Sequence, residues 1–219
     1  MAYSVKEIFY TLQGEGGQAG RAAVFCRFAG CNLWSGREED RASAACTFCD
    51  TDFIGTNGIG GGKFTDATAL AQRIAEEWTA TSTTPSQHRF VVLTGGEPLL
   101  QVDAALIHAL HLQGFTIGVE TNGTLEAPPG IDWLCVSPKG QAPLALNRGQ
   151  ELKLVYPQPG IDPGQFENLN FSYFYLQPQD PRNGSVELAN ANTQACIDYC
   201  RTHPQWRLSL QTHKWLGIP

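Results

Sequence analysis

The sequence predicts a single α/β domain built around a parallel sheet, in the form of a reduced or partial (β/α) barrel. Short β-rich runs recur along the chain with helical or loop segments between them, the rhythm of parallel strands joined by crossover connections. The 219 residues suffice for one domain with a substantial core and are too few for two of ordinary size. We therefore expect one domain over residues 1–219.

Six runs are expected to form the strands. They are residues 22–28, 89–94, 116–120, 131–137, 150–155 and 173–177. The connections at 121–130 and 138–149 hold too few residues, and too many Gly and Pro, for full crossover helices. The barrel is therefore expected to be reduced or open.

The first helix is expected at residues 65–78, between the first two strands. Leu70, Ile74 and Trp78 recur there at four-residue spacing and so share one face. Thr65 precedes this pattern and is a residue type that caps helix N-termini well. We therefore predict an amphipathic helix that is capped by Thr65.

Two more helices are expected, at residues 99–113 and 186–202. Pro98 suits the first turn of the earlier helix, and Gly114 suits its C-terminal end. The other connections contain no helical pattern of similar length.

The charge balance disfavours a nucleic-acid partner. The chain has 15 Lys and Arg against 21 Asp and Glu, a net charge of −6, and no basic run of the kind that binds a phosphate backbone. No apolar run approaches the length that spans a bilayer, and the first residues lack the pattern of a signal peptide. We expect a cytoplasmic protein with a small-molecule substrate and with no membrane or nucleic-acid partner.

Three cysteines, Cys31, Cys46 and Cys49, form the strongest chemical signal in the chain. The total of seven cysteines is odd, in a chain with no export signal, which favours metal or redox chemistry over disulfides. A structural zinc site is normally closed by four protein ligands. Three thiolates without a fourth nearby instead suit a 4Fe-4S cluster whose remaining iron is open to a small molecule.

The other four cysteines are interpreted as packing residues. They are Cys26, Cys135, Cys196 and Cys200. Buried free cysteine behaves as a small hydrophobic residue, and Cys26 alternates with apolar residues along a predicted strand. Cys26 competes with Cys31 for the first ligand position, but Cys31 follows a glycine turn and is freer to reach a cluster.

Unusual residues follow five of the predicted strands. They are Cys31, TGGEP at 94–98, ETNG at 120–123, SPK at 137–139 and QPQD at 177–180. Because ligands of parallel α/β sheets gather at the carboxyl ends of the strands, we expect these five loops to converge on one rim.

The GGEP motif is a weak signal on its own. Gly95 and Gly96 permit a close approach of the backbone to a ligand. Glu97 and Pro98 equally suit a plain turn from a strand into the next helix.

Together these motifs resemble the radical S-adenosylmethionine superfamily. A three-cysteine cluster after the first strand, ending in CTFC, precedes GGEP after the second strand, in the order of that superfamily. The chain places fourteen residues between Cys31 and Cys46, more than the superfamily usually has. A partial (β/α) barrel is the fold that this resemblance implies.

A narrower resemblance covers nearly the whole chain. The motifs YTLQGEG, FCRFAGCNLW, FCDT, TGGEP, ETNG, VSPK, YLQPQD and THKWLGIP are similar to those of the 7-carboxy-7-deazaguanine synthase family. Some members of that family have an enlarged cluster loop, which fits residues 32–45. The resemblance implies a carbon–nitrogen lyase of queuosine precursor biosynthesis, which converts 6-carboxy-5,6,7,8-tetrahydropterin to 7-carboxy-7-deazaguanine and ammonia.

The same resemblance implies cofactors and partners. The cofactors would be a 4Fe-4S cluster, S-adenosylmethionine that is regenerated in each turnover, and Mg²⁺. The partners would be the pterin substrate, a reductant such as flavodoxin and a second copy of the chain in a homodimer.

The site residues follow from the matched motifs. Cys31, Cys46 and Cys49 would hold the cluster. S-adenosylmethionine would contact Phe48, Cys49, Asp50, Gly96, Ser137, Pro138, Lys139, Gln177, Pro178, Gln179 and Asp180. Thr51 would ligate Mg²⁺, and the substrate would contact Leu12, Gln13, Gly14, Arg27, Thr94 and the terminal carboxylate of Pro219. Glu15 and Glu120 would be further substrate partners, with His213 and Lys214 anchoring the tail.

Two of these residues also have simpler interpretations. Arg27 lies on the strand face opposite Cys26, so in a barrel it would face the cavity, where its planar fork matches a carboxylate. A structural salt bridge explains Arg27 equally well. Without the resemblance, Thr51 would be a turn residue.

Two other functions stay open at this point. An activase that installs a glycyl radical on a partner protein would share the cluster and GGEP. A zinc-binding interaction module could use Cys26 together with Cys31, Cys46 and Cys49. The glycine-rich string within residues 55–63 is expected to be a flexible loop, and no role is assigned to it.

Overall fold

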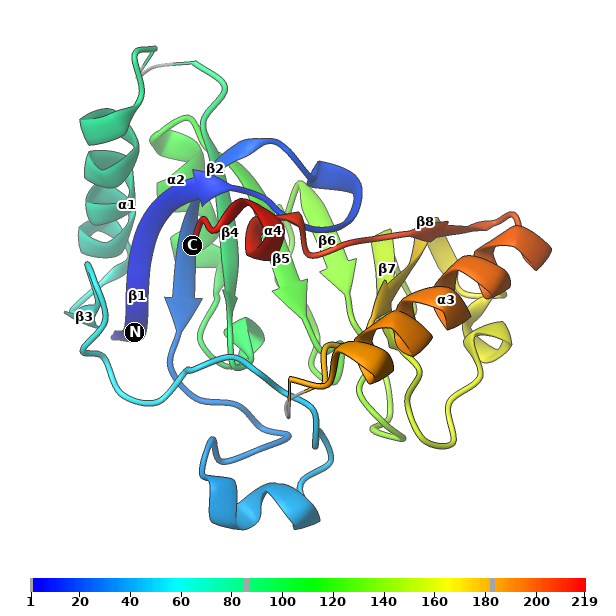
Figure 1. Cartoon of the computed structure of the whole chain (residues 1–219). Coiled ribbons are helices and arrows are strands. Elements are labelled where there is room, and N and C mark those ends of the chain that lie inside the picture. Colours follow the sequence, from blue (N-terminus) through cyan, green and yellow to red (C-terminus); the bar gives the residue numbers. More distant parts are fainter. Residues whose placement is uncertain (1, 85–86, 182–183) are drawn as a thin grey trace.

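The computed structural model describes residues 2–84, 87–181 and 184–219 and is built on one curved sheet (Figure 1). In these residues the sheet has nine strands, in the order β3-β1-β2-β4-β5-β6-β7-β8-β9. The strands are β1 (Tyr3–Leu12), β2 (Ala22–Phe28), β3 (Gly62–Phe64), β4 (Phe90–Gly95), β5 (Thr116–Thr121), β6 (Trp133–Val136), β7 (Arg148–Tyr156), β8 (Asn170–Pro178) and β9 (Trp206–Leu208). From β2 to β9 neighbouring strands are parallel, whereas β1 is antiparallel to both β2 and β3.

The described residues also form four α-helices and four short 3-10 helices. The α-helices are α1 (Ala67–Thr81), α2 (Ala104–Leu112), α3 (Val186–Thr202) and α4 (Thr212–Leu216). The 3-10 helices are η1 (Gly16–Gln18), η2 (Glu38–Ser43), η3 (Pro98–Leu100) and η4 (Pro163–Phe166). None of the described helices combines the length and the apolar character that crossing a membrane requires.

The six predicted strands are confirmed, and the sequence prediction missed three others. The missed strands are β1, β3 and β9. The alternation along β1 is broken because its register to β2 shifts between Val5 and Glu7. The predicted flexible loop at 55–63 is wrong in part, because Ile8 N donates to Ile59 O at 2.7 Å and Gly58 N donates to Lys6 O at 2.9 Å. These bonds attach the glycine-rich segment to β1.

The first predicted helix is confirmed, but its cap is not Thr65. The carboxylate of Asp66 accepts a hydrogen bond from Ala69 N at 2.9 Å, so Asp66 is the N-cap of α1. Thr65 donates its hydroxyl to Asp66 instead. Asp and Thr are both good caps, and the choice between neighbours depends on where the chain leaves the extended conformation.

The predicted helix at 99–113 is two separate elements, η3 and α2. Gln101 lies between them, and its side chain accepts from Ser4 N at 2.7 Å and donates to Ala29 O at 2.9 Å. Asp103 then caps α2 by accepting from Leu106 N at 2.9 Å. The tertiary bonds of Gln101 thus interrupt a sequence whose pattern favoured one helix. The third helix is confirmed with the predicted bounds, 186–202.

The two faces of the sheet differ in chemistry. Helices α1, α2 and α3 pack on the outer face, where Leu70, Ile74 and Trp78 of α1 join one continuous apolar core as predicted. The inner face carries charged and polar side chains, and β7 shows the change by alternation. Leu152 and Leu154 belong to the core, while Lys153 between them lines the interior.

The last residues of the chain return to the first strand. In Figure 1 the red segment after β9 runs across the strands toward the blue β1. Thr212 N donates to Gly14 O at 3.1 Å, and Gly16 N donates to Ser209 Oγ at 2.9 Å. The segment therefore covers the open side of the partial barrel that the sequence predicted.

Candidate active site

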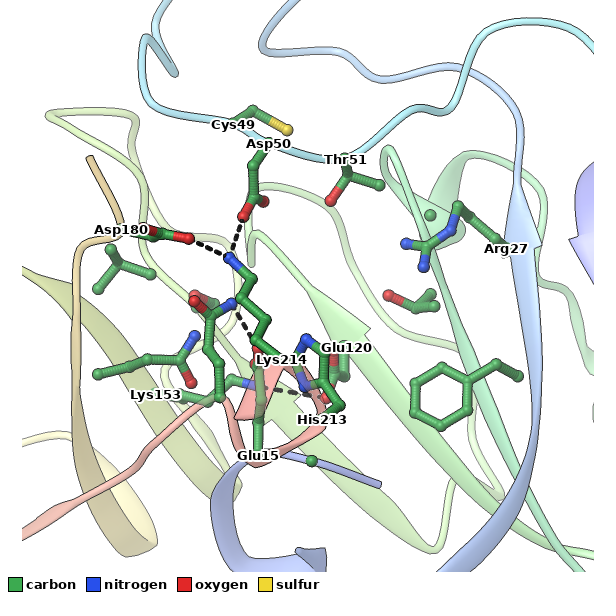
Figure 2. Close-up of a pocket in the computed structure, with 18 of the residues that line it drawn as sticks. Glu15, Arg27, Cys49, Asp50, Thr51, Glu120, Lys153, Asp180, His213 and Lys214 are labelled. Carbon is green, nitrogen blue, oxygen red and sulfur yellow. Dashed lines mark hydrogen bonds and ion pairs between the residues drawn. The ribbon is translucent and has the colours of Figure 1, made fainter. Parts of the chain in front are cut away.

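A cavity of about 450 Å³ lies inside the partial barrel, at the carboxyl ends of the parallel strands. Its volume falls in the range of about 300–1,000 Å³ that small-molecule sites occupy. Inward side chains of the strands, the loops that follow them and the C-terminal segment all contribute to its wall (Figure 2). The expected convergence of loops on one rim is therefore present.

Most of the site residues expected from the sequence line this one cavity. They are Leu12, Gln13, Gly14, Arg27, Phe48, Cys49, Asp50, Thr51, Thr94, Gly96, Ser137, Lys139, Gln177, Pro178, Gln179, Asp180 and Pro219. Cys31, Cys46 and Pro138 are not part of the lining. Pro138 lies behind it, where its carbonyl accepts from Gln158 Nε2 at 3.2 Å.

The three cysteines of the predicted cluster interact electrostatically with one another. The hydrogen bond that the Cys46 thiol donates lowers the pKa of Cys49 to about 6, and the N–H of Thr51 contributes to this effect. The same bond, together with burial, raises the pKa of Cys46. Burial also raises the pKa of Cys31. One sulfur of the three is thus prepared to be a thiolate.

The donor set fits an iron–sulfur cluster. Three thiols from one loop, one of them with a depressed pKa, are the ligand chemistry that such clusters use. Within the described ranges no three Cys, His, Asp or Glu side chains form a group spaced for a single metal ion. Cys26 is fully buried in the core on the outer face of β2, as expected for a packing residue.

The GGEP turn is fitted against the start of the cluster loop. A Cβ on Gly96 would lie 2.1 Å from the Gly30 carbonyl oxygen, so only glycine allows this approach. Gly95 has a φ of +135°, in the region that favours glycine. Glu97 N donates to Gly30 O at 2.9 Å. The two glycines therefore allow the turn after β4 to pack closely against the loop that begins at Cys31.

Glu97 links this turn to the ETNG turn. Its carboxylate is fully buried and accepts from Thr121 Oγ1 at 2.7 Å and from Asn122 N at 2.8 Å. It also accepts from Leu99 N, so Glu97 caps η3 and Pro98 begins it. The interpretation of GGEP as a strand-to-helix turn is confirmed, and the turn also braces the rim.

The floor of the cavity holds a buried cation between two carboxylates. Lys153 Nζ lies 2.7 Å from Glu15 Oε2 and 3.1 Å from Glu120 Oε1, and the Lys153 side chain is 5% exposed. Burial alone would raise the pKa of Glu15, but the charge and hydrogen bond of Lys153 lower it to about 2. Gln13 Nε2 donates to Glu120 at 2.9 Å, and Gln211 Nε2 donates to Glu15 at 2.9 Å.

Lys153 was missed by the sequence analysis, although a signal was present. In the run ELKLVY, Glu151 and Lys153 alternate with two leucines, so a charged stripe shares one strand with an apolar one. Buried strands are seldom charged on one face unless that face lines a cavity or a paired network.

Lys214 of α4 joins two loops of the rim. Figure 2 shows its ammonium between Asp50 and Asp180, at 2.9 and 2.5 Å from their carboxylate oxygens. Burial alone would lower the pKa of Lys214, but the two carboxylates raise it. The predicted anchoring role of Lys214 is consistent with these pairs, and His213 also lines the cavity.

Arg27 makes the structural salt bridge that was considered for it and also lines the cavity. Arg27 Nε pairs with Glu7 Oε1 at 2.7 Å, and the guanidinium lies at the cavity on the side of Thr51 (Figure 2). Thr51 lines the same wall. Across the rim, Lys139 Nζ donates to Ser137 Oγ at 2.5 Å. The cavity wall thus carries the cationic side chains of Arg27 and Lys139 in addition to Lys153 at its floor and Lys214 at its rim.

Comparison with known proteins agrees with this architecture. No family model matches the chain. The chain is 65% identical over 222 residues to 7-carboxy-7-deazaguanine synthase of Bordetella pertussis and 59% identical over 219 residues to that of Burkholderia multivorans, with 100% of each chain covered in both cases. The crystal structure of QueE from Escherichia coli superimposes with a TM-score of 0.66 and 27% identity, covering 96% of this chain and 94% of that one. Full-length identity at this level, together with the shared fold, shows that the chain belongs to the 7-carboxy-7-deazaguanine synthase family.

Proposed function

We propose that the chain converts 6-carboxy-5,6,7,8-tetrahydropterin to 7-carboxy-7-deazaguanine and ammonia by a radical ring contraction, as a lyase of queuosine precursor biosynthesis. The observation that carries the proposal is that one cavity unites the cysteine loop, a cationic wall at Arg27 and the charged floor around Lys153. These are the groups that a cluster, a carboxylated substrate and an N–H-rich ring need.

The cofactor side of the cavity supports radical chemistry. When bound, a 4Fe-4S cluster and S-adenosylmethionine supply a carbon radical that removes hydrogen from an unactivated C–H bond, and Mg²⁺ supplies a Lewis acid. Cys31, Cys46 and Cys49 would hold the cluster. The polar rim beside Cys49 would bind S-adenosylmethionine through Phe48, Asp50, Gly96, Ser137, Pro138, Lys139, Gln177, Pro178, Gln179 and Asp180.

The substrate side supports a carboxylated pterin. The Arg27 guanidinium would pair with the substrate carboxylate, because its planar fork matches two carboxylate oxygens. The Thr51 hydroxyl would share Mg²⁺ with that carboxylate, since hard cations prefer oxygen ligands. Leu12, Gln13, Gly14, Thr94 and Pro219 would complete the binding site.

The floor would orient the ring by accepting hydrogen bonds. Glu15 stays ionised at neutral pH because Lys153 depresses its pKa, so it presents acceptor oxygens to ring N–H groups. Glu120 lines the same cavity and shares Lys153. Two carboxylates facing one ammonium leave acceptor capacity for a neutral, donor-rich edge such as that of a pterin.

The alternatives receive less support. A zinc module would need Cys26 beside the rim cysteines, but Cys26 faces the opposite side of β2 and is fully buried in the core. A glycyl-radical activase would give no role to the buried Glu15, Lys153 and Glu120 group or to the C-terminal segment that lines the cavity. A homodimer, a flavodoxin reductant and a cytoplasmic location belong to the same proposal as the synthase.

The test is an anaerobic assay of the reconstituted protein. Dithionite, Mg²⁺, S-adenosylmethionine and the pterin are supplied, and products are followed by mass. Formation of 7-carboxy-7-deazaguanine is the expected result. Cleavage of S-adenosylmethionine with unchanged pterin would contradict the substrate assignment, and failure to assemble a cluster would contradict the cofactor assignment as well.

A further inference from the structure

The enlarged cluster loop is organised around one buried arginine, Arg41. Its Nη1 donates to two main-chain oxygens of the neighbouring CTFC segment, Thr47 O at 3.1 Å and Cys49 O at 2.9 Å. Its Nε donates to Glu38 Oε2 at 2.9 Å. The Arg41 side chain is 11% exposed, which is unusual for arginine on a loop.

An aromatic platform holds the guanidinium in place. Arg41 lies 3.8 Å from the ring centroid of Trp34, and Trp34 Nε1 donates to Arg37 O at 3.0 Å. Trp34 in turn packs edge to face on Phe53, with ring centroids 5.5 Å apart. Both aromatic rings are buried. Trp34, Phe53 and Arg41 therefore form one packed group that holds the guanidinium against the CTFC segment.

The two carbonyls that Arg41 binds flank Phe48, between the second and third cluster cysteines. A carbonyl that accepts from a fixed guanidinium keeps its peptide plane in one orientation. The two bonds therefore fix the main chain at Cys49 and at Thr47, the residue that follows Cys46. Both carbonyls accept from Nη1, while Nε of the same rigid plane faces Glu38 and the plane lies over Trp34. A lysine ammonium also has several donors, but its flexible stem does not hold them in one fixed plane.

We propose that Arg41 is a positioning residue that presets the CTFC segment for its cluster. The insertion at 32–45 then orders the segment that carries two of the three cluster cysteines. The inference rests on the cluster assigned under the proposed function. It concerns retention of iron, so it is tested independently of pterin turnover.

The experiment compares Arg41→Met with Arg41→Lys and with Arg37→Met. Arg37 is a control from the same loop, because its side chain is 72% exposed and its carboxylate partner, Glu39, is 3.8 Å away. Each protein is reconstituted anaerobically with iron and sulfide, and the rate at which a chelator removes iron is measured without substrate. The melting temperature of each apo protein is measured alongside.

We expect Arg41→Met to lose iron at least tenfold faster than the parent, since the loss of even one hydrogen bond to a charged group has an effect of about that size. Arg41→Lys should lose iron nearly as fast as Arg41→Met, because an ammonium on a flexible stem keeps the charge without holding the carbonyls in fixed orientations. Arg37→Met should match the parent. The apo melting temperatures of the Arg37 and Arg41 variants should agree to within a few degrees, which separates positioning from folding.

Iron loss from Arg41→Met at the parent rate would overturn the proposal, and so would full rescue by Arg41→Lys, because charge alone would then explain the effect. If Arg41→Met does not fold, Arg41→Lys decides in the same way: faster iron loss than the parent supports positioning, and parent-like retention refutes it. A parent protein that holds its cluster but leaves the pterin unchanged would refute the substrate assignment and leave this inference standing.

Discussion

The two faces of β7 follow opposite rules within one strand. Leu152 and Leu154 point outward and are fully buried in the apolar core. Lys153, which lies between them, is equally hidden from solvent but is held by Glu15 and Glu120. The outer face gains stability from burial of apolar area. The inner face keeps charges in a low-dielectric site, where a buried ion pair adds little net stability.

The difference shows that burial alone does not define the function of a residue here. An outward residue contributes to the free energy of unfolding and leaves the cavity unchanged. An inward residue keeps its neighbours charged and oriented, so its loss should appear in catalysis of the folded fraction. Substitutions that separate these two readouts test the comparison directly.

The largest effect is expected for Lys153→Met, compared with Leu154→Ala on the adjacent position. Lys153→Met leaves Glu15 and Glu120 without their cation, so we expect a loss of about 3–5 kcal/mol in unfolding free energy. It should also lower kcat/KM of the folded fraction about a hundredfold, the scale seen when a preorganised polar group is removed.

Leu154→Ala should cost about 2–5 kcal/mol of stability with kcat/KM per folded molecule unchanged. Urea unfolding of the apo proteins and activity per reconstituted cluster provide the two readouts. Equal activity losses in both variants would break the distinction between the faces.

The next effect concerns the C-terminal segment, which joins the inner face from the far end of the chain. Pro219 lines the cavity, and its oxygen accepts from Thr11 Oγ1 at 3.0 Å. Residues appended after Pro219 would occupy substrate space, so we expect kcat/KM to fall at least tenfold, about 1.4 kcal/mol. The same peptide fused ahead of residue 1 serves as the control. Full activity with the C-terminal extension would remove Pro219 from the binding site.

A third effect is the pH dependence of the buried pair. The pKa of Glu15 is lowered from 4.5 to about 2 in the folded protein, so its contribution is complete above about pH 4.5 and is lost as pH falls toward 2. Glu15→Gln should flatten this part of the stability curve of the apo protein, measured by urea unfolding at several pH values. Glu39→Gln is the control, because Glu39 is 74% exposed. Identical curves for both variants would contradict the assigned coupling.

The smallest effect is expected for Lys214→Met. Lys214 is 36% exposed and its two partners are about half exposed, so the pairs should contribute less than about 1 kcal/mol to stability. Loosening α4 from the rim should nevertheless raise the KM for the pterin about threefold with kcat unchanged, because loosening adds an ordering cost to binding of roughly that size. Steady-state kinetics measure kcat and KM separately and so test this prediction. A fall in kcat alone would indicate a role in the reaction itself.

Local signals in the sequence were sufficient for much of the outer face. The predicted bounds of α3 are confirmed, and Ser185 caps it by accepting from Leu188 N at 3.2 Å. The face of α1 formed by Leu70, Ile74 and Trp78 was equally clear. These features depend on neighbours within the same element.

Long-range contacts explain what sequence reasoning missed. Gln101 ends η3 because of bonds to Ser4 and Ala29, some 97 and 72 residues away. The role of Lys153 depends on Glu15, 138 residues earlier in the chain. Neither partner is visible from local periodicity. The residues assigned by resemblance line the cavity with few exceptions. A family motif identifies such residues directly, without any need to infer the long-range contacts that bring them together.

The attachment of residues 209–219 to residues 11–16 also constrains how the protein comes into being. Thr11 bonds to Pro219 across 208 positions, and Gly16 bonds to Ser209 across 193. Contacts of such sequence separation form late, because a long loop must close before they gain anything. Strands and helices with local contacts can form earlier, but the cavity stays open on this side until residues 209–219 dock beside β1. A closed cavity therefore depends on contacts between segments far apart in the sequence rather than on any one local element.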